Sequence, residues 1–148
     1  MDLDPTVGAG GGADAECRHP WVAPVDAAVV DPFRPPDGPS GPGNRGIEYG
    51  TESGQPVVAI GGGLVDFAGP VAGHPVVVID HGAGLRSSYV NLLDRSVDRG
   101  QLVERGQPIA LADAAFHLGV RRDGIYLDPS PLLSQLCEIV RLVALPSE

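Results

Sequence analysis

The stretch at residues 76–92 decides the fold class, and it reads VVVIDHGAGLRSSYVNL. Its first four residues are apolar and β-branched, which predicts a buried strand. The Gly82-Ala83-Gly84 run predicts a tight turn after that strand. From residue 85 to residue 92 the pattern has period two, which is typical of a second strand. The period-two positions on one face are Ser87, Tyr89 and Asn91. The stretch therefore predicts two consecutive strands joined by a turn.

Short strands and turns extend in both directions from this stretch. Strands are predicted at residues 27–30, 55–60, 64–67, 107–112, 116–121 and 125–127. A turn is predicted around Gly69-Pro70, and the Arg122-Asp123-Gly124 run predicts a hairpin. Residues 34–43 have the Gly and Pro content of a loop. Residues 131–137 have leucines at helical spacing, so one short C-terminal helix is expected.

Length and composition agree with a single, mainly β domain. The chain has 148 residues, of which 21 are glycine and 15 are proline, whereas aromatic residues make up only 5%. So much Gly and Pro excludes a helical bundle. Residues 1–20 are rich in glycine and predict a flexible tail. The domain itself is expected at residues 21–133, followed by a C-terminal extension at 134–148.

The charge pattern excludes several kinds of partner. Nineteen acidic residues against ten basic ones give a net charge of −9, and all the basic residues are arginines. No basic patch is dense enough for a phosphate backbone, so nucleic-acid binding is not expected. No apolar run approaches the length of a membrane span. The first residues lack the basic start of an export signal, so the chain is either cytoplasmic or separated from such a signal.

The two cysteines leave two interpretations open. Cys17 and Cys137 lie near opposite ends of the chain, and no Cys-x-x-Cys motif exists. That spacing excludes zinc-ribbon and thioredoxin sites. A disulfide between the two residues and a pair of separate thiols are both consistent with the sequence.

A series of ordered motifs from residue 21 to residue 133 resembles the lysostaphin-type zinc peptidases, the LytM or M23 family. The motifs are Trp21 with Pro24-Val25, Phe33, Arg45-Gly46-Ile47-Glu48-Tyr49, Gly54-Gln55-Pro56-Val57-Val58-Ala59, Gly63-Leu64-Val65, Val78-Ile79-Asp80-His81-Gly82, Tyr89-Val90-Asn91-Leu92, Val103-Glu104-Arg105-Gly106-Gln107, His117-Leu118-Gly119-Val120-Arg121, Asp128-Pro129 and Leu132-Leu133. The resemblance implies a duplicated hybrid fold. Its expected parts are a central antiparallel sheet, long loops walling a cleft, and the short C-terminal helix.

The resemblance also shows where the family's chemistry has been lost. Family members hold zinc with a His-x-x-x-Asp pair and the second histidine of a His-x-His pair. Here those positions are Asn44 and Glu48 in the first pair, and Ala115 and His117 in the second. A further family histidine, in a Tyr-x-His segment that assists proton transfer, corresponds to Asn91. Only one of the four family histidines is therefore present.

This residue set is expected to be catalytically inactive. Asn44 is a poor zinc ligand, because zinc sites use imidazole, thiolate or carboxylate. Two remaining candidates, Glu48 and His117, are too few to retain zinc, so no cofactor is expected. Ala115 and Asn91 cannot transfer a proton near neutral pH. Weak zinc binding through Glu48, His117 and an unassigned third group is left open.

Other residues resemble groove-lining positions of the family or its scaffold. Tyr49, Arg86 and Tyr89 are the candidate cleft residues, although packing explains the two tyrosines equally well. His81 lies in Asp80-His81-Gly82, a segment that resembles a structural turn of the family. Inactive relatives often act as regulators, so the resemblance implies a binding or regulatory module of the bacterial envelope. The expected partner is a cell-wall hydrolase, another envelope protein or peptidoglycan, and the expected location is the periplasm, the cell wall or the exterior. The alternatives are a residual zinc endopeptidase that cleaves peptidoglycan cross-links, and a passive structural domain.

Overall fold

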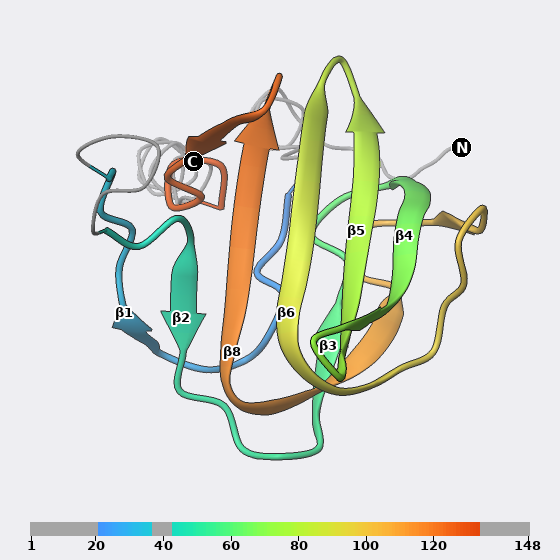
Figure 1. Ribbon diagram of the computed structural model, residues 1–148, viewed down its shortest axis with the longest axis horizontal. Helices are drawn as coiled ribbons and strands as arrows, with labels where there is room; N and C mark the ends of the chain where they lie inside the picture. The colour runs from blue at the N-terminus through green and yellow to red at the C-terminus, as the bar shows by residue number, and fades with distance from the viewer. Residues whose placement is uncertain (1–20, 37–42, 134–148) are drawn as a thin grey trace, which may run out of the picture.

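The computed structural model describes residues 21–36 and 43–133, which form one nine-stranded antiparallel sheet (Figure 1). The strands are β1 (Val29–Asp31), β2 (Ile47–Tyr49), β3 (Gln55–Val58), β4 (Gly63–Val71), β5 (His74–Gly82), β6 (Leu85–Arg95), β7 (Leu102–Val103), β8 (Pro108–Arg122) and β9 (Ile125–Leu127). Their order is β1-β2-β8-β6-β5-β4-β7, and β3 and β9 each pair with β8. The mainly β class and the central antiparallel sheet are confirmed.

Strand β8 organises the sheet, because four other strands pair with it. Its first half pairs with β3, and its second half pairs with β2 and with β9. Strand β6 runs along the other side of both halves. The predicted hairpin at Arg122-Asp123-Gly124 joins β8 to β9, with positive φ at Asp123 and Gly124. Glycine adopts that conformation without steric cost.

The prediction of separate strands at 107–112 and 116–121 is wrong, because both belong to β8. The ladder with β6 changes register sharply, from Val90 opposite His117 to Leu92 opposite Ala112. The extra residues on β8 form a bulge, and such bulges bend a strand. Thr51 holds this bend: its hydroxyl donates to the Asp113 carbonyl (2.6 Å) and accepts from the Phe116 N–H (3.1 Å). The hydroxyl of Thr51 therefore bonds two backbone groups of β8 at this bend.

The predicted turn at Gly69-Pro70 is also wrong, because β4 continues to Val71. The turn lies at Ala72 and Gly73, which both have positive φ. Pro70 is tolerated within the strand because β7 pairs with β4 only at Gly63 and Leu64, leaving the rest of β4 at an edge. Proline has no N–H to donate to a neighbouring strand, and an edge position does not require that donor.

The described residues contain no helix, and none of them forms a helix able to span a membrane. Of the predicted C-terminal helix, residues 131–133 form a turn in which the Leu133 N–H donates to the Pro129 carbonyl (3.1 Å). The rest of that helix, the predicted tail and extension, and both cysteines lie outside the described residues.

The core lies under one face of β8, where three aromatic rings form a stack. The ring of Phe116 lies between those of Tyr49 (6.0 Å between centroids) and Tyr89 (6.3 Å). Tyr49 is 4% exposed and Tyr89 is fully buried. Both rings pack in this core, which is the alternative to a groove position that the sequence left open for them. The reason is the pleat: their strands turn them to the face opposite His117, and that face is the core.

A buried hydrogen-bond chain links β5, β6 and the segment after β3. The Ile60 N–H donates to the Tyr89 hydroxyl (3.0 Å), which lies 2.8 Å from the Ser87 hydroxyl. The Ser87 hydroxyl lies 2.8 Å from His81 Nε2, and His81 Nδ1 lies 2.8 Å from the Gly62 carbonyl. A carbonyl can only accept, so His81 Nδ1 carries the proton of its bond to Gly62.

We expect Tyr89→Phe to lower the free energy of unfolding by about 1–3 kcal/mol, because the buried Ile60 N–H loses its acceptor. Urea unfolding followed by Trp21 fluorescence measures the change. Tyr126→Phe is the matched control, since Tyr126 is 39% exposed. Equal losses in the two variants would contradict the structural role of the chain.

We expect the thermal midpoint to fall as the pH is lowered through 6.5. Burial lowers the pKa of His81 below its usual 6.5, and neither the Gly62 carbonyl nor Asp80 fully offsets this. The unfolded chain therefore binds more protons near pH 6, so the stability present above pH 6.5 is lost as the pH falls. Calorimetry between pH 7.5 and 5 should show a smaller drop for His81→Gln. His74→Gln, at an exposed position, should leave the drop unchanged.

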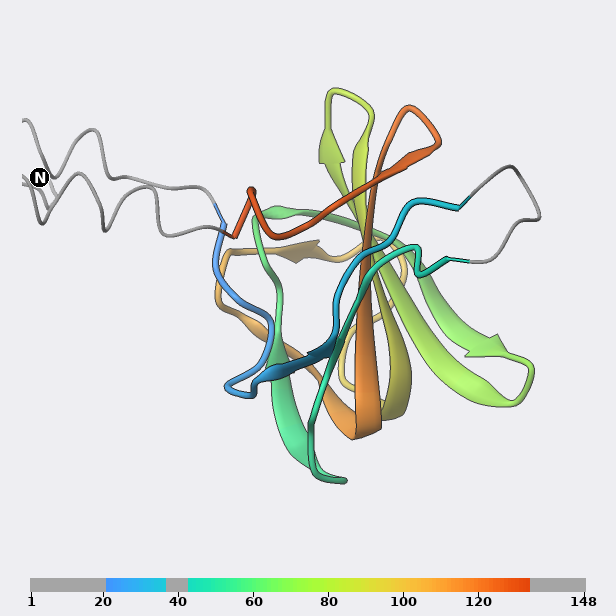
Figure 2. The same cartoon turned by 90° about the vertical axis from the view of Figure 1, so that its left-hand side faces the viewer.

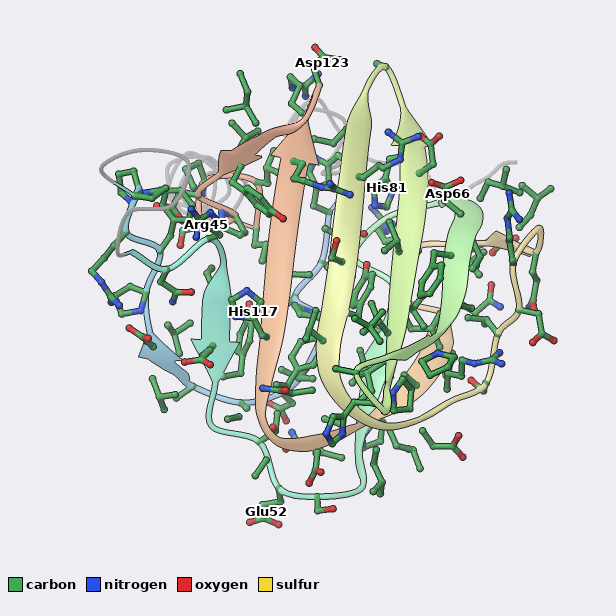
Figure 3. All side chains as sticks on the ribbon, viewed as in Figure 1. Arg45, Glu52, Asp66, His81, His117 and Asp123 are labelled. Carbon is green, nitrogen blue, oxygen red and sulfur yellow. The ribbon has the colours of Figure 1, made fainter. Side chains whose placement is uncertain are left out.

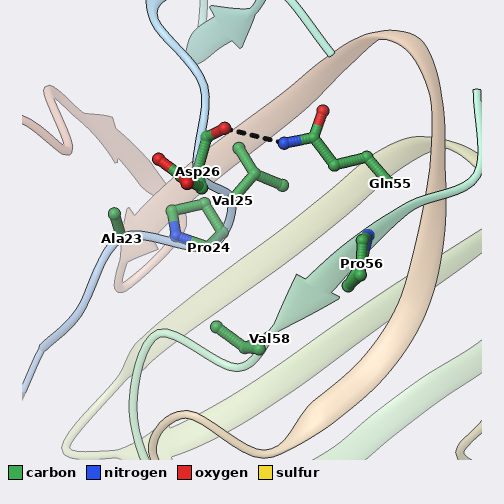
Figure 4. Close-up of a pocket in the computed structure, with 7 residues that line it drawn as sticks. All are labelled: Ala23, Pro24, Val25, Asp26, Gln55, Pro56 and Val58. Atoms are coloured by element: carbon green, nitrogen blue, oxygen red, sulfur yellow. Dashed lines mark hydrogen bonds between the residues drawn. The ribbon is translucent and has the colours of Figure 1, made fainter. Parts of the chain in front are cut away.

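An open groove separates the first described segment from β3. Its volume is about 650 Å³, and Ala23, Pro24, Val25, Asp26, Gln55, Pro56 and Val58 line it (Figure 4). The Gln55 amide donates to the Asp26 carbonyl (2.7 Å) across one end, and the Val58 N–H donates to the Pro24 carbonyl (2.8 Å). These bonds tie the first segment to the edge of β3.

Candidate functional site

A row of three ionisable side chains crosses the face of the sheet opposite the core. Strand β2 places Glu48 directly opposite His117 of β8, and β1 places Asp31 opposite Glu48. Residues that face each other in antiparallel strands project to the same side. Figure 3 shows His117 between β2 and β8 on this open face. Two carboxylates and one imidazole therefore share one row.

Burial and the two carboxylates of the row have opposite effects on the pKa of His117. Desolvation lowers the pKa of His117, whereas the Glu48 and Asp31 carboxylates act in the opposite direction. The imidazole also lies close to the backbone just before β2, since a Cβ added at Gly46 would be 2.5 Å from His117 Nε2. Only glycine at residue 46 leaves room for this ring.

Arg34 supplies a positive charge to the row, although neither it nor Asp31 was among the predicted site residues. Arg34 forms a salt bridge with Asp31, and this guanidinium holds the pKa of the Asp31 carboxyl below its usual value. The Arg34 side chain is 55% exposed and that of Asp31 is 36% exposed, so solvent screens the pair. The signal in the sequence is faint: Asp31 follows the apolar run 27–30, and Arg34 begins the predicted loop.

Asn44 stabilises the neighbouring loop. Its side-chain amide donates to the carbonyls of Asp31 (3.2 Å) and Pro32 (3.0 Å), and the residue is only 8% exposed. Its backbone exchanges two hydrogen bonds with Arg34 (2.8 and 3.0 Å). The amide nitrogen is therefore committed to holding the chain that carries Asp31.

Asn91 and Ala115 come together at the bend of β6 and β8. The Asn91 amide donates to the Ala115 carbonyl (2.8 Å), and both residues have φ near +60°. Asparagine tolerates that conformation, whereas alanine is strained in it. The structure therefore joins the two degenerate catalytic positions to each other, two residues before His117 on β8.

Arg86 lies on the same open face but farther along the strands. It is opposite Arg121 on β8, four residues beyond His117. Its guanidinium bonds Asp66 (3.2 Å) and Asp80 (3.5 Å), so nearby carboxylates already neutralise it. Figure 3 shows Asp66 and His81 at this end of the sheet. The structure therefore does not group Arg86 with the row.

The residues at the predicted metal positions do not fit a catalytic zinc ion. Such an ion takes three protein ligands of the imidazole, thiolate or carboxylate type and keeps one position open. Asn44 contributes none of these groups, and its amide nitrogen is engaged with backbone carbonyls. Within residues 21–36 and 43–133, no three His, Cys, Asp or Glu side chains form a group able to hold a metal ion.

Comparisons with known proteins identify the class of protein that has this sheet. A family model described as Peptidase family M23 matches residues 42–129, which is more than half of the chain. The chain belongs to peptidase family M23.

Three relatives illustrate the range of the family. The uncharacterised protein Rv2891 of Mycobacterium tuberculosis is 35% identical over 90% of this chain and 57% of its own length. The murein hydrolase activator NlpD of Salmonella typhimurium is 30% identical over 78% of this chain and 32% of its own length. A zinc-containing peptidase from Vibrio cholerae has the same fold, with a TM-score of 0.66 and 28% identity over 78% of this chain and 40% of the other. The chain thus spans little more than half of Rv2891.

Proposed function

We propose that this chain is a catalytically inactive M23 domain that binds a cell-wall hydrolase of the bacterial envelope and regulates it. The domain keeps the sheet that positions the family's site but lacks most of the side chains that would use it. The open face of the sheet is then a binding surface rather than a catalytic one.

The observation that carries this proposal is the use of Asn44 and Asn91. Each amide donates to backbone carbonyls at the place where a catalytic member would need an imidazole. Ala115 offers no proton donor or acceptor in its side chain. General acid–base catalysis typically contributes 10²–10⁴-fold, and these residues cannot provide it.

The relatives support a regulatory role outside the cytoplasm. NlpD of Salmonella typhimurium is named a murein hydrolase activator, and a relative of 32% identity from Pseudomonas aeruginosa is a lipoprotein of the NlpD/LppB type. We therefore place this domain in the periplasm, in the cell wall or outside the cell. We further propose residues 21–133 as the folded domain, with no resident metal ion.

Residual zinc peptidase activity is the second candidate. It would need Glu48, His117 and a third ligand, and Glu48 and His117 do face each other on β2 and β8. The similarity to the zinc-containing peptidase of Vibrio cholerae points the same way. A passive structural role is the third candidate and predicts neither activation nor hydrolysis.

Dye release from labelled peptidoglycan tests the proposal. The chain alone should release no dye, whereas adding it to a purified cell-wall amidase should raise release severalfold. Glu48→Ala with His117→Ala should weaken the activation, because both side chains lie on the open face. Glu104→Ala with His74→Ala removes the same groups at exposed positions elsewhere and should not. Unchanged release with every hydrolase tested would contradict the proposal.

A further inference from the structure

The two ends of the described chain lie over one buried row of the sheet. Ser87 of β6 lies opposite Val120 of β8, and Val120 lies opposite Leu127 of β9. Ser87 and Val120 are fully buried, so this row belongs to the core. Adjacent strands lie about 4.8 Å apart, which separates the backbones of Ser87 and Leu127 by about 10 Å.

Trp21, the first described residue, lies at the Ser87 end of this row. Its ring meets the His81 ring edge-on, with 5.0 Å between the centroids, and His81 Nε2 lies 2.8 Å from the Ser87 hydroxyl. The N–H of the next residue, Val22, donates to the Ile60 carbonyl (2.8 Å). The start of the described chain is therefore fixed beside β5 and β6, on the core side.

Leu133, the last described residue, lies near the Leu127 end of the row. It follows Leu127 by six positions, and its N–H donates back to the Pro129 carbonyl (3.1 Å), which keeps the segment compact. Leu132 and Leu133 pack against the same core as Trp21 and Leu127. Figure 2 shows the blue start and the red end of the described chain on the same side of the molecule. The described chain therefore begins and ends within a short distance, on the core side of β8.

One cysteine lies just beyond each of these ends in the sequence. Cys17 precedes Trp21 by four residues, and Cys137 follows Leu133 by four residues. Both cysteines are outside the described residues, and only the length of chain between each of them and the domain matters here. Four residues span at most about 14 Å, and a disulfide needs Cα atoms about 4.4–6.8 Å apart. The two thiols can therefore meet without any change in the described domain.

We propose that Cys17 and Cys137 form a disulfide that joins the two ends of the domain. The oxidant is a disulfide compound such as oxidised glutathione. One cysteine thiolate attacks it and releases a thiol, and the second thiolate then displaces the other thiol from the mixed disulfide. The two cysteines lose two electrons and two protons, and the oxidant is reduced to two thiols. Disulfides persist in oxidising compartments, so the inference rests on the extracytoplasmic location that belongs to the proposed function.

The bridge closes a long loop that contains the whole sheet. Cys17 and Cys137 are 120 positions apart, and every described residue lies between them. In the chain-entropy model the stabilisation by a disulfide grows with the length of the loop that it closes. A bridge at this place also keeps the Trp21 segment beside β5 and β6, where the ring of His81 and the carbonyl of Ile60 hold it.

Mass spectrometry of the full chain tests the bridge directly. The chain is refolded in a buffer of reduced and oxidised glutathione and digested with trypsin without reduction. Because trypsin cleaves after arginine, Cys17 lies in the peptide 1–18 and Cys137 lies in the peptide 123–141. We expect these two peptides to be joined, and to separate when a reductant is added. Free thiols, glutathione adducts on both cysteines, or bridges between two chains would each overturn the inference.

Calorimetry measures what the bridge contributes to stability. We expect reduction to lower the thermal midpoint by about 10–20 °C. Cys17→Ser, Cys137→Ser and the double variant should each have the midpoint of the reduced chain and should not respond to the reductant. An equal response of the double variant, or a bridged chain whose midpoint stays unchanged on reduction, would refute the disulfide as a link that stabilises the domain.

The hydrolase assay separates this inference from the function on which it rests. Activation by a chain that forms no bridge in the glutathione buffer would leave the regulatory function intact and refute the disulfide alone. A bridged chain that activates no hydrolase would refute the regulatory function alone.

Discussion

Asn44→His combined with Glu48→Asp should convert this domain into a stoichiometric zinc-binding protein. The two substitutions restore the family's His-x-x-x-Asp pair, and His117 lies opposite residue 48 on β8. Residue 44 would then add a third ligand of the correct type to residues 48 and 117. At a zinc concentration one hundred times the dissociation constant, binding should raise the free energy of unfolding by about 2.7 kcal/mol. Zinc titration followed by calorimetry measures it.

Two control variants make this result specific. Asn44→Gln with Glu48→Asp keeps an amide at residue 44 and should bind no zinc. Adding His117→Ala to the zinc-binding variant should abolish uptake. Asn44→His also removes the amide bonds to Asp31 and Pro32, which costs about 1 kcal/mol in the absence of zinc. No zinc uptake by a folded double variant would mean that residue 44 cannot join residues 48 and 117 in a metal site.

Gly46→Ala should lower the free energy of unfolding by about 3 kcal/mol. A Cβ at residue 46 would lie 2.2 Å from the Leu118 carbonyl oxygen and 2.5 Å from His117 Nε2. The backbone of β8 cannot move away without breaking its ladder with β6, so β2 must separate from β8. Urea unfolding measures the loss.

Gly119→Ala is the matched control for this substitution. It adds the same methyl group on the same face of β8, but the nearest atoms are 3.6 and 3.7 Å away, which is ordinary contact. We expect a change within about 0.5 kcal/mol. A Gly46→Ala variant as stable as Gly119→Ala would contradict the close packing of β2 on β8.

Local patterns in the sequence predict most of the sheet, because strands and tight turns depend on neighbouring residues. The period-two stretch at 85–92 and the Arg122-Asp123-Gly124 hairpin are both present in the structure. The continuity of β8 could not be predicted, because the hydroxyl of Thr51, distant in sequence, holds its bend. Tyr89 shows a similar limit, because period two places it on the same face as Ser87 but does not say which face is the core.

The candidate site also combines residues that the sequence indicates with contacts that only the folded chain shows. The family resemblance indicates residues 44, 48, 91, 115 and 117. In the structure Glu48 faces His117 and Asn91 bonds Ala115, whereas Asn44 lies before β2 and is bridged to Arg34. The pairing of Asp31 with Arg34 depends on β1 lying next to β2, which local sequence patterns do not encode. The roles of Asn44 and Asn91 in bonding backbone carbonyls are likewise tertiary contacts.

The most direct test of the central claim is the zinc content of the unaltered chain, measured together with its action on peptidoglycan. The protein is purified without chelator, its zinc is determined by mass spectrometry, and dye release from labelled peptidoglycan is followed with and without added zinc. We predict far less than one zinc ion per chain and no release above that of heat-inactivated protein. One tightly held zinc ion per chain, with hydrolysis that a chelator abolishes, would contradict the account.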